Sequence, residues 1–169
     1  MGICVRVNKF FTMSIFWLLF VGKIPPELAL LYQHLYTIDL TSNLIHMEGD
    51  DFGVFELLTN LETLLMDDNF LVSDGGLPWQ FKKLEKLQKM RLSYNLLAGE
   101  LESDKPVLDH LTKLTHLEIE SNFLTGTIPQ AIASMTNLVY LYMRRNDLTF
   151  NLNFLKQGKL TDLCKLFWY

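Results

Sequence analysis

One phrase of sequence recurs along most of this chain of 169 residues. Its fullest copy begins at Leu114 and reads LTHLEIESNFLTGTIP. The leading apolar residue of each copy recurs at Leu35, Leu61, Leu87, Leu114, Leu138 and Leu163, in steps of 26, 26, 27, 24 and 25 residues. A near-constant period of this size indicates a solenoid, in which each repeat packs only on its neighbours. The period therefore restricts the possible folds more than any other feature of the sequence.

Each repeat begins with alternating apolar and polar residues, as in Leu117 to Glu120. This alternation predicts a short strand with one buried face. An asparagine follows the strand in five repeats, at Asn43, Asn69, Asn95, Asn122 and Asn146. A buried turn leaves backbone donors and acceptors without partners, and an amide side chain supplies both kinds of group. We therefore expect the asparagines to form a structural ladder through the solenoid.

The pattern resembles the leucine-rich repeat family, and its Leu-x-Gly-x-Ile-Pro ending at Leu124 to Pro129 is similar to the plant-specific repeats of receptor-like proteins. The resemblance covers residues 22–169, with repeats starting near residues 35, 61, 87, 114 and 138 and a partial repeat at residue 163. The other repeats match the ending less well, and the repeat at Leu138 has Phe150 in place of the glycine. The resemblance implies an α/β solenoid: a horseshoe with a parallel concave sheet and short helical or irregular convex segments.

Residues 1–21 form a separate apolar N-terminal segment with three open interpretations. Arg6 and Lys9 precede an apolar run over residues 10–21, as in a signal peptide, but small residues suited to cleavage are missing. The run is shorter than the roughly 20 residues of a membrane-spanning helix, which leaves an anchor as a second interpretation. Thirdly, Gly22-x-Ile24-Pro25 lies one period before the next repeat, so the segment also fits a degenerate leading repeat.

The two ends of the chain carry few other signals. The stretch from Leu163 to Trp168 begins a sixth strand, and neither end shows a polar capping repeat, which suggests a fragment of a longer protein. Cys4 and Cys164 lie near opposite ends of an elongated fold, so we expect no disulfide between them.

The sequence contains no recognisable catalytic constellation, phosphate-binding loop or zinc-type spacing of histidines and cysteines. We therefore predict a protein that is not an enzyme and that needs no cofactor and no metal. A net charge of -4 argues against nucleic-acid binding. Asp67 and Asp68 are expected to be solvated carboxylates, and the basic residues from Lys82 to Arg91 divide between the convex side and the next strand.

The resemblance places the ligand surface on the concave face, at strand positions between the leucines. Its middle positions are Asp39, Leu65, Arg91, Glu118 and Tyr142. The predicted partner-binding residues are Asp67, Asp68, Arg91, Tyr94, Glu118, Glu120, Tyr140, Tyr142, Arg144 and Arg145. Tyr140 to Arg145 is the candidate hot spot, because Tyr and Arg are enriched at such positions. A simpler interpretation is that Glu120 and Arg144 pair across adjacent strands.

The sequence thus predicts a non-catalytic recognition module that binds a protein or peptide, with a carbohydrate as another option. Two alternatives stay open: the truncated ligand-sensing region of a receptor-like kinase, and a secreted inhibitor of an extracellular enzyme. Membrane association or secretion follows if residues 10–21 are a targeting segment, and a cytoplasmic location follows otherwise.

Overall fold

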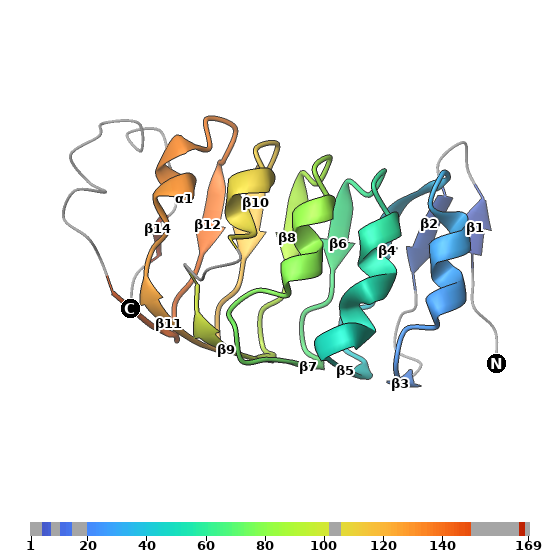
Figure 1. Ribbon diagram of the computed structural model, residues 1–169, viewed down its shortest axis with the longest axis horizontal. Helices are drawn as coiled ribbons and strands as arrows, with labels where there is room; N and C mark the ends of the chain where they lie inside the picture. The colour runs from blue at the N-terminus through green and yellow to red at the C-terminus, as the bar shows by residue number, and fades with distance from the viewer. Residues whose placement is uncertain (1–4, 8–10, 15–19, 102–105, 150–165, 168–169) are drawn as a thin grey trace.

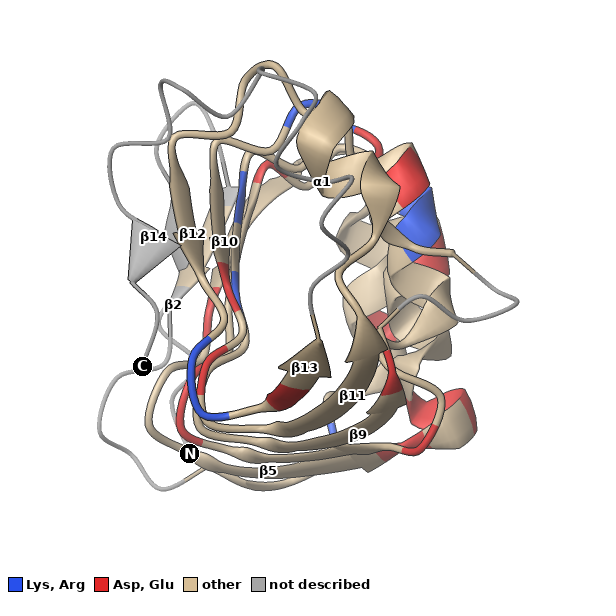
Figure 2. Cartoon of the chain, turned by 90° about the vertical axis from the view of Figure 1, so that its left-hand side faces the viewer, with Lys and Arg blue, Asp and Glu red and all other residues tan. Residues whose placement is uncertain are grey.

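The computed structural model describes residues 5–7, 11–14, 20–101, 106–149 and 166–167. The chain winds through successive coils, and each complete coil contributes a strand to a long sheet, a strand to a second sheet and a short helical segment (Figure 1). Viewed along the solenoid axis, the two sheets and the helical segments form three sides around a common interior (Figure 2). The repeat period therefore predicted the architecture correctly.

The long sheet is the concave sheet of the horseshoe. Its eight strands lie in the order β1 (Val5–Val7), β2 (Phe11–Ser14), β4 (Leu35–Asp39), β6 (Thr63–Leu65), β8 (Lys89–Arg91), β10 (His116–Glu118), β12 (Tyr140–Tyr142) and β14 (Leu166–Phe167). β1 pairs antiparallel with β2, and all the other pairs are parallel. The sixth strand predicted near Leu163 is present as β14, which pairs with β12.

A second parallel sheet, which the sequence analysis did not anticipate, lies next to the concave sheet. Its six strands are β3 (Val21–Gly22), β5 (Leu44–Glu48), β7 (Phe70–Ser73), β9 (Leu96–Glu100), β11 (Phe123–Thr127) and β13 (Asp147–Thr149). Each of these strands from β5 onward begins directly after a ladder asparagine. The chain thus leaves one sheet and enters the other within a few residues.

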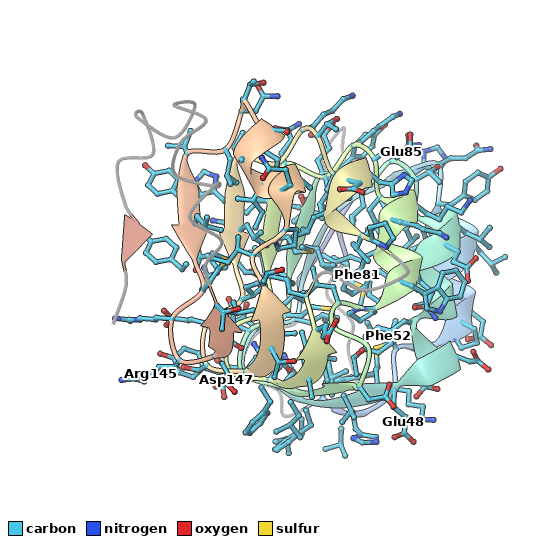
Figure 3. All side chains as sticks on the ribbon, turned by 60° about the vertical axis from the view of Figure 1, so that its left-hand side comes forward. Glu48, Phe52, Phe81, Glu85, Arg145 and Asp147 are labelled. Atoms are coloured by element: carbon cyan, nitrogen blue, oxygen red, sulfur yellow. The ribbon has the colours of Figure 1, made fainter. Side chains whose placement is uncertain are left out.

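The third side consists of short helical segments, as predicted for the convex side. They are the 3₁₀ helices η1 (Pro26–Leu31), η2 (Gly49–Leu57), η3 (Trp79–Lys83) and η4 (Leu108–His110) and the α-helix α1 (Gln130–Ser134). Phe52 and Phe81 project from η2 and η3 into the interior (Figure 3), and both rings and that of Phe55 in η2 are almost fully buried. The Phe81 ring packs edge-on against the other two rings, with centroid distances of 5.7 Å to Phe52 and 5.0 Å to Phe55. Leucines and other apolar residues of both sheets complete one continuous core.

The asparagine ladder is present at all five positions. Asn122 shows the pattern: its Nδ2 donates to the carbonyl oxygens of Leu92, Ile119 and Glu120 at 3.0 to 3.2 Å. Its Oδ1 accepts the N–H of Leu97 at 3.0 Å. The amide thus joins its own turn to the preceding repeat, and it satisfies backbone groups that face away from water.

Residues near the N-terminus continue both sheets. β2 pairs in parallel with β4, and β3 pairs in parallel with β5. Met13 and Ile24 are buried in the core. Cys4 and Cys164, for which no disulfide was expected, lie outside the described residues.

Candidate functional site

The concave face presents two straight rows of side chains, because the parallel strands pair in register. One row contains Thr37, Thr63, Lys89, His116 and Tyr140, and the other contains Asp39, Leu65, Arg91, Glu118 and Tyr142. The second row contains the middle strand positions that the sequence analysis assigned to this face. The strands therefore hold these ten side chains on a common surface at intervals of about 4.8 Å.

Arg91 connects two acidic residues of neighbouring repeats at the centre of this face. Its Nη2 lies 2.7 Å from Asp67 Oδ2, and its Nε lies 3.3 Å from Glu118 Oε2. Asp67 Oδ1 also accepts the backbone N–H of Ser93 at 2.9 Å. The three charged side chains therefore form an internal ion-pair network across β6, β8 and β10.

The expectation that Asp67 is a solvated carboxylate was wrong. Only 4% of Asp67 is exposed, because the residue sits where the chain turns into the ladder and Arg91 covers it. Burial raises the pKa of Asp67 to about 6, and the charge of Arg91 and the Ser93 N–H offset only part of this shift. Asp67 thus holds Arg91 in place and offers little surface of its own to a partner.

Glu120 and Arg144 pair across adjacent repeats, as the simpler interpretation of the sequence predicted. Arg144 Nε donates to Glu120 Oε2 at 2.6 Å, and Arg144 Nη2 donates to Glu120 Oε1 at 3.4 Å. Burial raises the pKa of Glu120, but the hydrogen bonds from Arg144 and Tyr94 and the charges of Arg144 and Arg145 together outweigh it, so the net pKa lies below the usual value. The Arg144 side chain remains partly accessible, and Glu120 fixes its orientation.

Aromatic side chains also lie on the concave face in the C-terminal repeats. The ring of Tyr140 stacks on the ring of His116, with centroids 4.3 Å apart and an interplanar angle of 26°. Burial, with a smaller contribution from the positive charge of Lys89, lowers the pKa of His116, which favours a neutral ring in this stack. Tyr142 stands opposite Glu118 in the register. His116 is a member of this cluster that the sequence analysis did not single out, since only the register brings it beside Tyr140.

Three of the predicted residues occupy a different position from the one expected. Asp68, Tyr94 and Arg145 precede ladder asparagines, and all three have a left-handed backbone, with φ of 56°, 57° and 54°. Ser42 and Ser121 have the same conformation in their repeats. This conformation turns the chain out of the concave sheet. The five side chains therefore lie along the corner between the two sheets, where basic and acidic residues gather (Figure 2).

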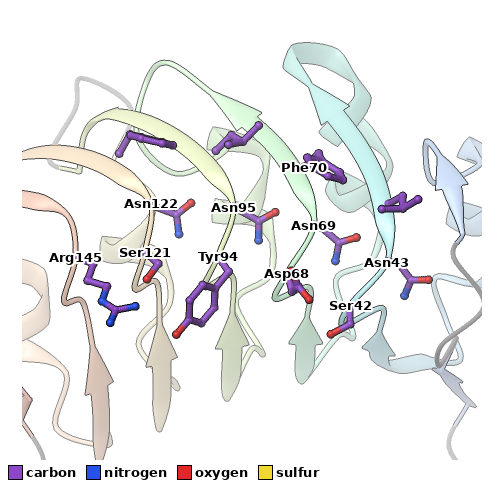
Figure 4. Close-up of a pocket in the computed structure, with 13 residues that line it drawn as sticks. Ser42, Asn43, Asp68, Asn69, Phe70, Tyr94, Asn95, Ser121, Asn122 and Arg145 are labelled. Carbon is purple, nitrogen blue, oxygen red and sulfur yellow. The ribbon is translucent and has the colours of Figure 1, made fainter.

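A groove of about 610 Å³ runs along this corner across five repeats (Figure 4). One wall is the row of left-handed residues, the floor contains the asparagines, and the other wall is the residue after each asparagine. That second wall consists of Leu44, Phe70, Leu96 and Phe123, which are 37%, 46%, 41% and 61% exposed. The sequence analysis missed this apolar wall, although an apolar residue directly after four of the five asparagines was visible in the repeat.

The described residues bring together no group of three or more His, Cys, Asp or Glu side chains suited to hold a metal ion. None of the helices among these residues has the length and apolar character that a membrane crossing requires.

Comparisons with known proteins agree with this geometry. The family model described as Leucine Rich Repeat matches residues 113–135. Receptor-like protein 52 of Arabidopsis thaliana is 38% identical over 86 residues, which are 51% of this chain and 10% of that protein. The ectodomain of the receptor kinase SOBIR1 from Arabidopsis thaliana has a TM-score of 0.70 at 26% identity, over 83% of this chain and 73% of that chain. The plant peptide hormone receptor RGFR1, solved in complex with RGF2, has a TM-score of 0.63 at 32% identity, over 77% of this chain and 19% of that chain.

The parallel concave sheet, the asparagine ladder and these similarities define a leucine-rich repeat solenoid. The chain is built of leucine-rich repeats that are similar to those of plant receptor-like proteins. It spans about a tenth of the length of receptor-like protein 52.

Proposed function

We propose that this chain recognises a protein or peptide partner through its concave face, in an extracellular receptor-like setting. The similarity to receptor ectodomains supports the setting, and the complex of RGFR1 with RGF2 supports a peptide as the partner. The contact surface is the C-terminal part of the face, formed by His116, Tyr140, Tyr142 and Arg144.

The observation that carries the proposal is that His116, Tyr140 and Arg144 are already held by other side chains in the free protein. His116 and Tyr140 stack on each other, and the carboxylate of Glu120 holds Arg144. A side chain that is ordered before binding loses less conformational entropy when a partner docks. Tyr and Arg side chains also dominate binding energies at interfaces. Fixed aromatic and cationic groups on the same face are therefore suited to bind a partner with apolar and acidic groups.

A selection experiment with a matched control tests the proposal. Phage displaying random dodecapeptides would be selected on the purified chain, and the affinities of the selected peptides would be measured by isothermal titration calorimetry. We expect Tyr142→Ala to weaken binding at least tenfold. Tyr32→Ala, which removes an exposed tyrosine near the end of η1, should leave the affinity within twofold.

The two variants also define the result that would overturn the proposal. Selected peptides that bind both variants as tightly as the original chain would show that the concave face is not the recognition surface. The thermal melting curves of the two variants serve as the folding control.

A further inference from the structure

The groove along the corner between the two sheets is a second surface, which adjoins the concave face at Tyr94. Exposed large apolar side chains concentrate there: of the ten among the described residues, Leu44, Phe70, Tyr94, Leu96 and Phe123 line the groove. Val21 pairs with Leu44 in the second sheet and extends the apolar wall toward the N-terminus. A contiguous exposed apolar stripe with a polar border is typical of an interaction site.

The charged residues on the polar wall of the groove differ from those on the concave face in their ion pairing. On the concave face, Arg91 pairs with Asp67 and Glu118, and Arg144 pairs with Glu120. In the groove, neither Asp68 nor Arg145 forms an ion pair, with an N···O distance of 4.0 Å or less, with another residue that the structure describes. The groove therefore presents one acidic and one basic group that are both available to an outside partner.

The spacing of these two charges limits the shape of that partner. The corner backbone continues the parallel pairing, as in the bonds from Asp68 N to Ser93 O and from Tyr94 N to Glu120 O, both 2.9 Å long. Three repeats separate Asp68 from Arg145, which is about 14 Å at about 4.8 Å per parallel strand. An extended peptide advances about 3.3 Å per residue, so residues i and i+4 of such a peptide are about 13 Å apart. A basic residue at i would face Asp68 when an acidic residue at i+4 faces Arg145.

The alternation of an extended chain assigns the remaining positions. Residues i, i+2 and i+4 point toward the polar wall, and residues i+1 and i+3 point to the opposite side. That side is the apolar wall of Phe70, Leu96 and Phe123 (Figure 4). We propose that the groove binds an extended peptide segment in which a basic and an acidic residue, four positions apart, flank two apolar residues at i+1 and i+3. The proposal does not rest on the function proposed for the concave face.

The direct test uses a fluorescein-labelled peptide of sequence GKLSLDG, blocked at its C-terminus, and measures fluorescence anisotropy with the purified chain. We expect saturable binding that weakens at least tenfold when both leucines of the peptide are replaced by serine. Peptide variants leave the protein unchanged, so protein folding does not affect this comparison. Absence of binding, or equal affinity for the serine peptide, would overturn the proposal.

Protein variants then locate the site. The double variant Phe70→Ser with Leu96→Ser should weaken GKLSLDG binding at least tenfold. The control Leu57→Ser, which changes a 58% exposed leucine on η2, should leave it within twofold. Tyr142→Ala should also have no effect, which separates this site from the concave face. An equal loss in the groove variant and the Leu57→Ser control would contradict the assigned site.

A charge reversal tests the assigned pairing. Asp68→Lys should weaken binding of GKLSLDG at least tenfold and restore binding to the peptide GELSLDG. Equal affinity of the original chain for the two peptides would contradict the pairing with Asp68. Sedimentation velocity gives a further outcome: a dimer that Phe70→Ser abolishes would show that a second copy of this chain occupies the groove, and the peptide proposal would then be wrong.

Discussion

Replacement of Asn122 by leucine tests the central structural claim, that the ladder asparagines satisfy buried backbone groups. Asn122 is buried, and leucine has a similar size but no polar atoms. The substitution therefore removes the side-chain hydrogen bonds without opening a large cavity. It leaves the strands on both sides of the turn in place.

The hydrogen bonds around Asn122 set the expected loss in the free energy of unfolding. Three carbonyl oxygens that accept from Asn122 have second donors, so they keep a partner: Leu92 O accepts from Asn95 Nδ2, Ile119 O from Asn146 Nδ2, and Glu120 O from Tyr94 N. The N–H of Leu97 loses its Asn122 acceptor and remains buried. One unsatisfied buried donor costs about 1–3 kcal/mol. For a chain of this length, that corresponds to a fall in melting temperature of roughly 3–9 °C.

The assay is thermal and urea unfolding followed by circular dichroism, with Asn137→Leu as the matched control. Asn137 is exposed, and its Nδ2 makes a single surface hydrogen bond to Thr112 O at 3.2 Å. We expect the control to change the free energy of unfolding by less than about 0.5 kcal/mol. Equal destabilisation by the two substitutions would refute the ladder argument. A loss well above 3 kcal/mol would show that the second donors do not compensate.

Two further predictions concern buried charge and backbone conformation. The folded-state pKa of Asp67 is about 6, above the ordinary aspartate pKa of 3.8, so the folded protein binds an additional proton between these values as the pH falls. Between pH 7 and pH 4 the free energy of unfolding of the original chain should therefore rise by about 2 kcal/mol relative to Asp67→Asn. Urea unfolding at both pH values would show no such gain if the carboxylate were solvated. Gly99 has a φ of 92°, and a Cβ there would overlap the carbonyl oxygen of Asp74. Gly99→Ala should destabilise the chain by at least about 1–3 kcal/mol. The control Gly75→Ala, at a position with open space around it, should change the melting temperature little. Similar melting temperatures for both variants would contradict the close approach of Gly99 to the Asp74 carbonyl oxygen.

The repeat and its asparagines could be read from the sequence, because both depend on local spacing. Apolar residues at alternate positions specify a strand with one buried face, and Asn122 specifies a turn that needs an amide. The same spacing correctly placed Arg91, Glu118 and Tyr142 in one row. The partner of the chain depends on residues that vary from repeat to repeat, and no periodic signal identifies it.

Three features of the candidate sites depended on contacts between repeats. The burial of Asp67 follows from its position beneath Arg91 of the next repeat, and the stack of His116 on Tyr140 follows from the strand register. The left-handed backbone of Tyr94 and Arg145 is unfavourable for these residue types, and the surrounding hydrogen bonds hold it in place. Local preferences of single residues do not contain this information.

The sequence alone therefore specified a leucine-rich repeat solenoid, its strands and its ladder, because each of these repeats within a window of about 25 residues. The tertiary structure decided where the charges and the exposed apolar side chains lie. Stacking pairs Arg91 and Arg144 with carboxylates of other repeats and leaves Asp68 and Arg145 beside an apolar wall. The physical reason is that burial and ion pairing are set by neighbouring repeats, which are distant in the sequence and adjacent in the solenoid.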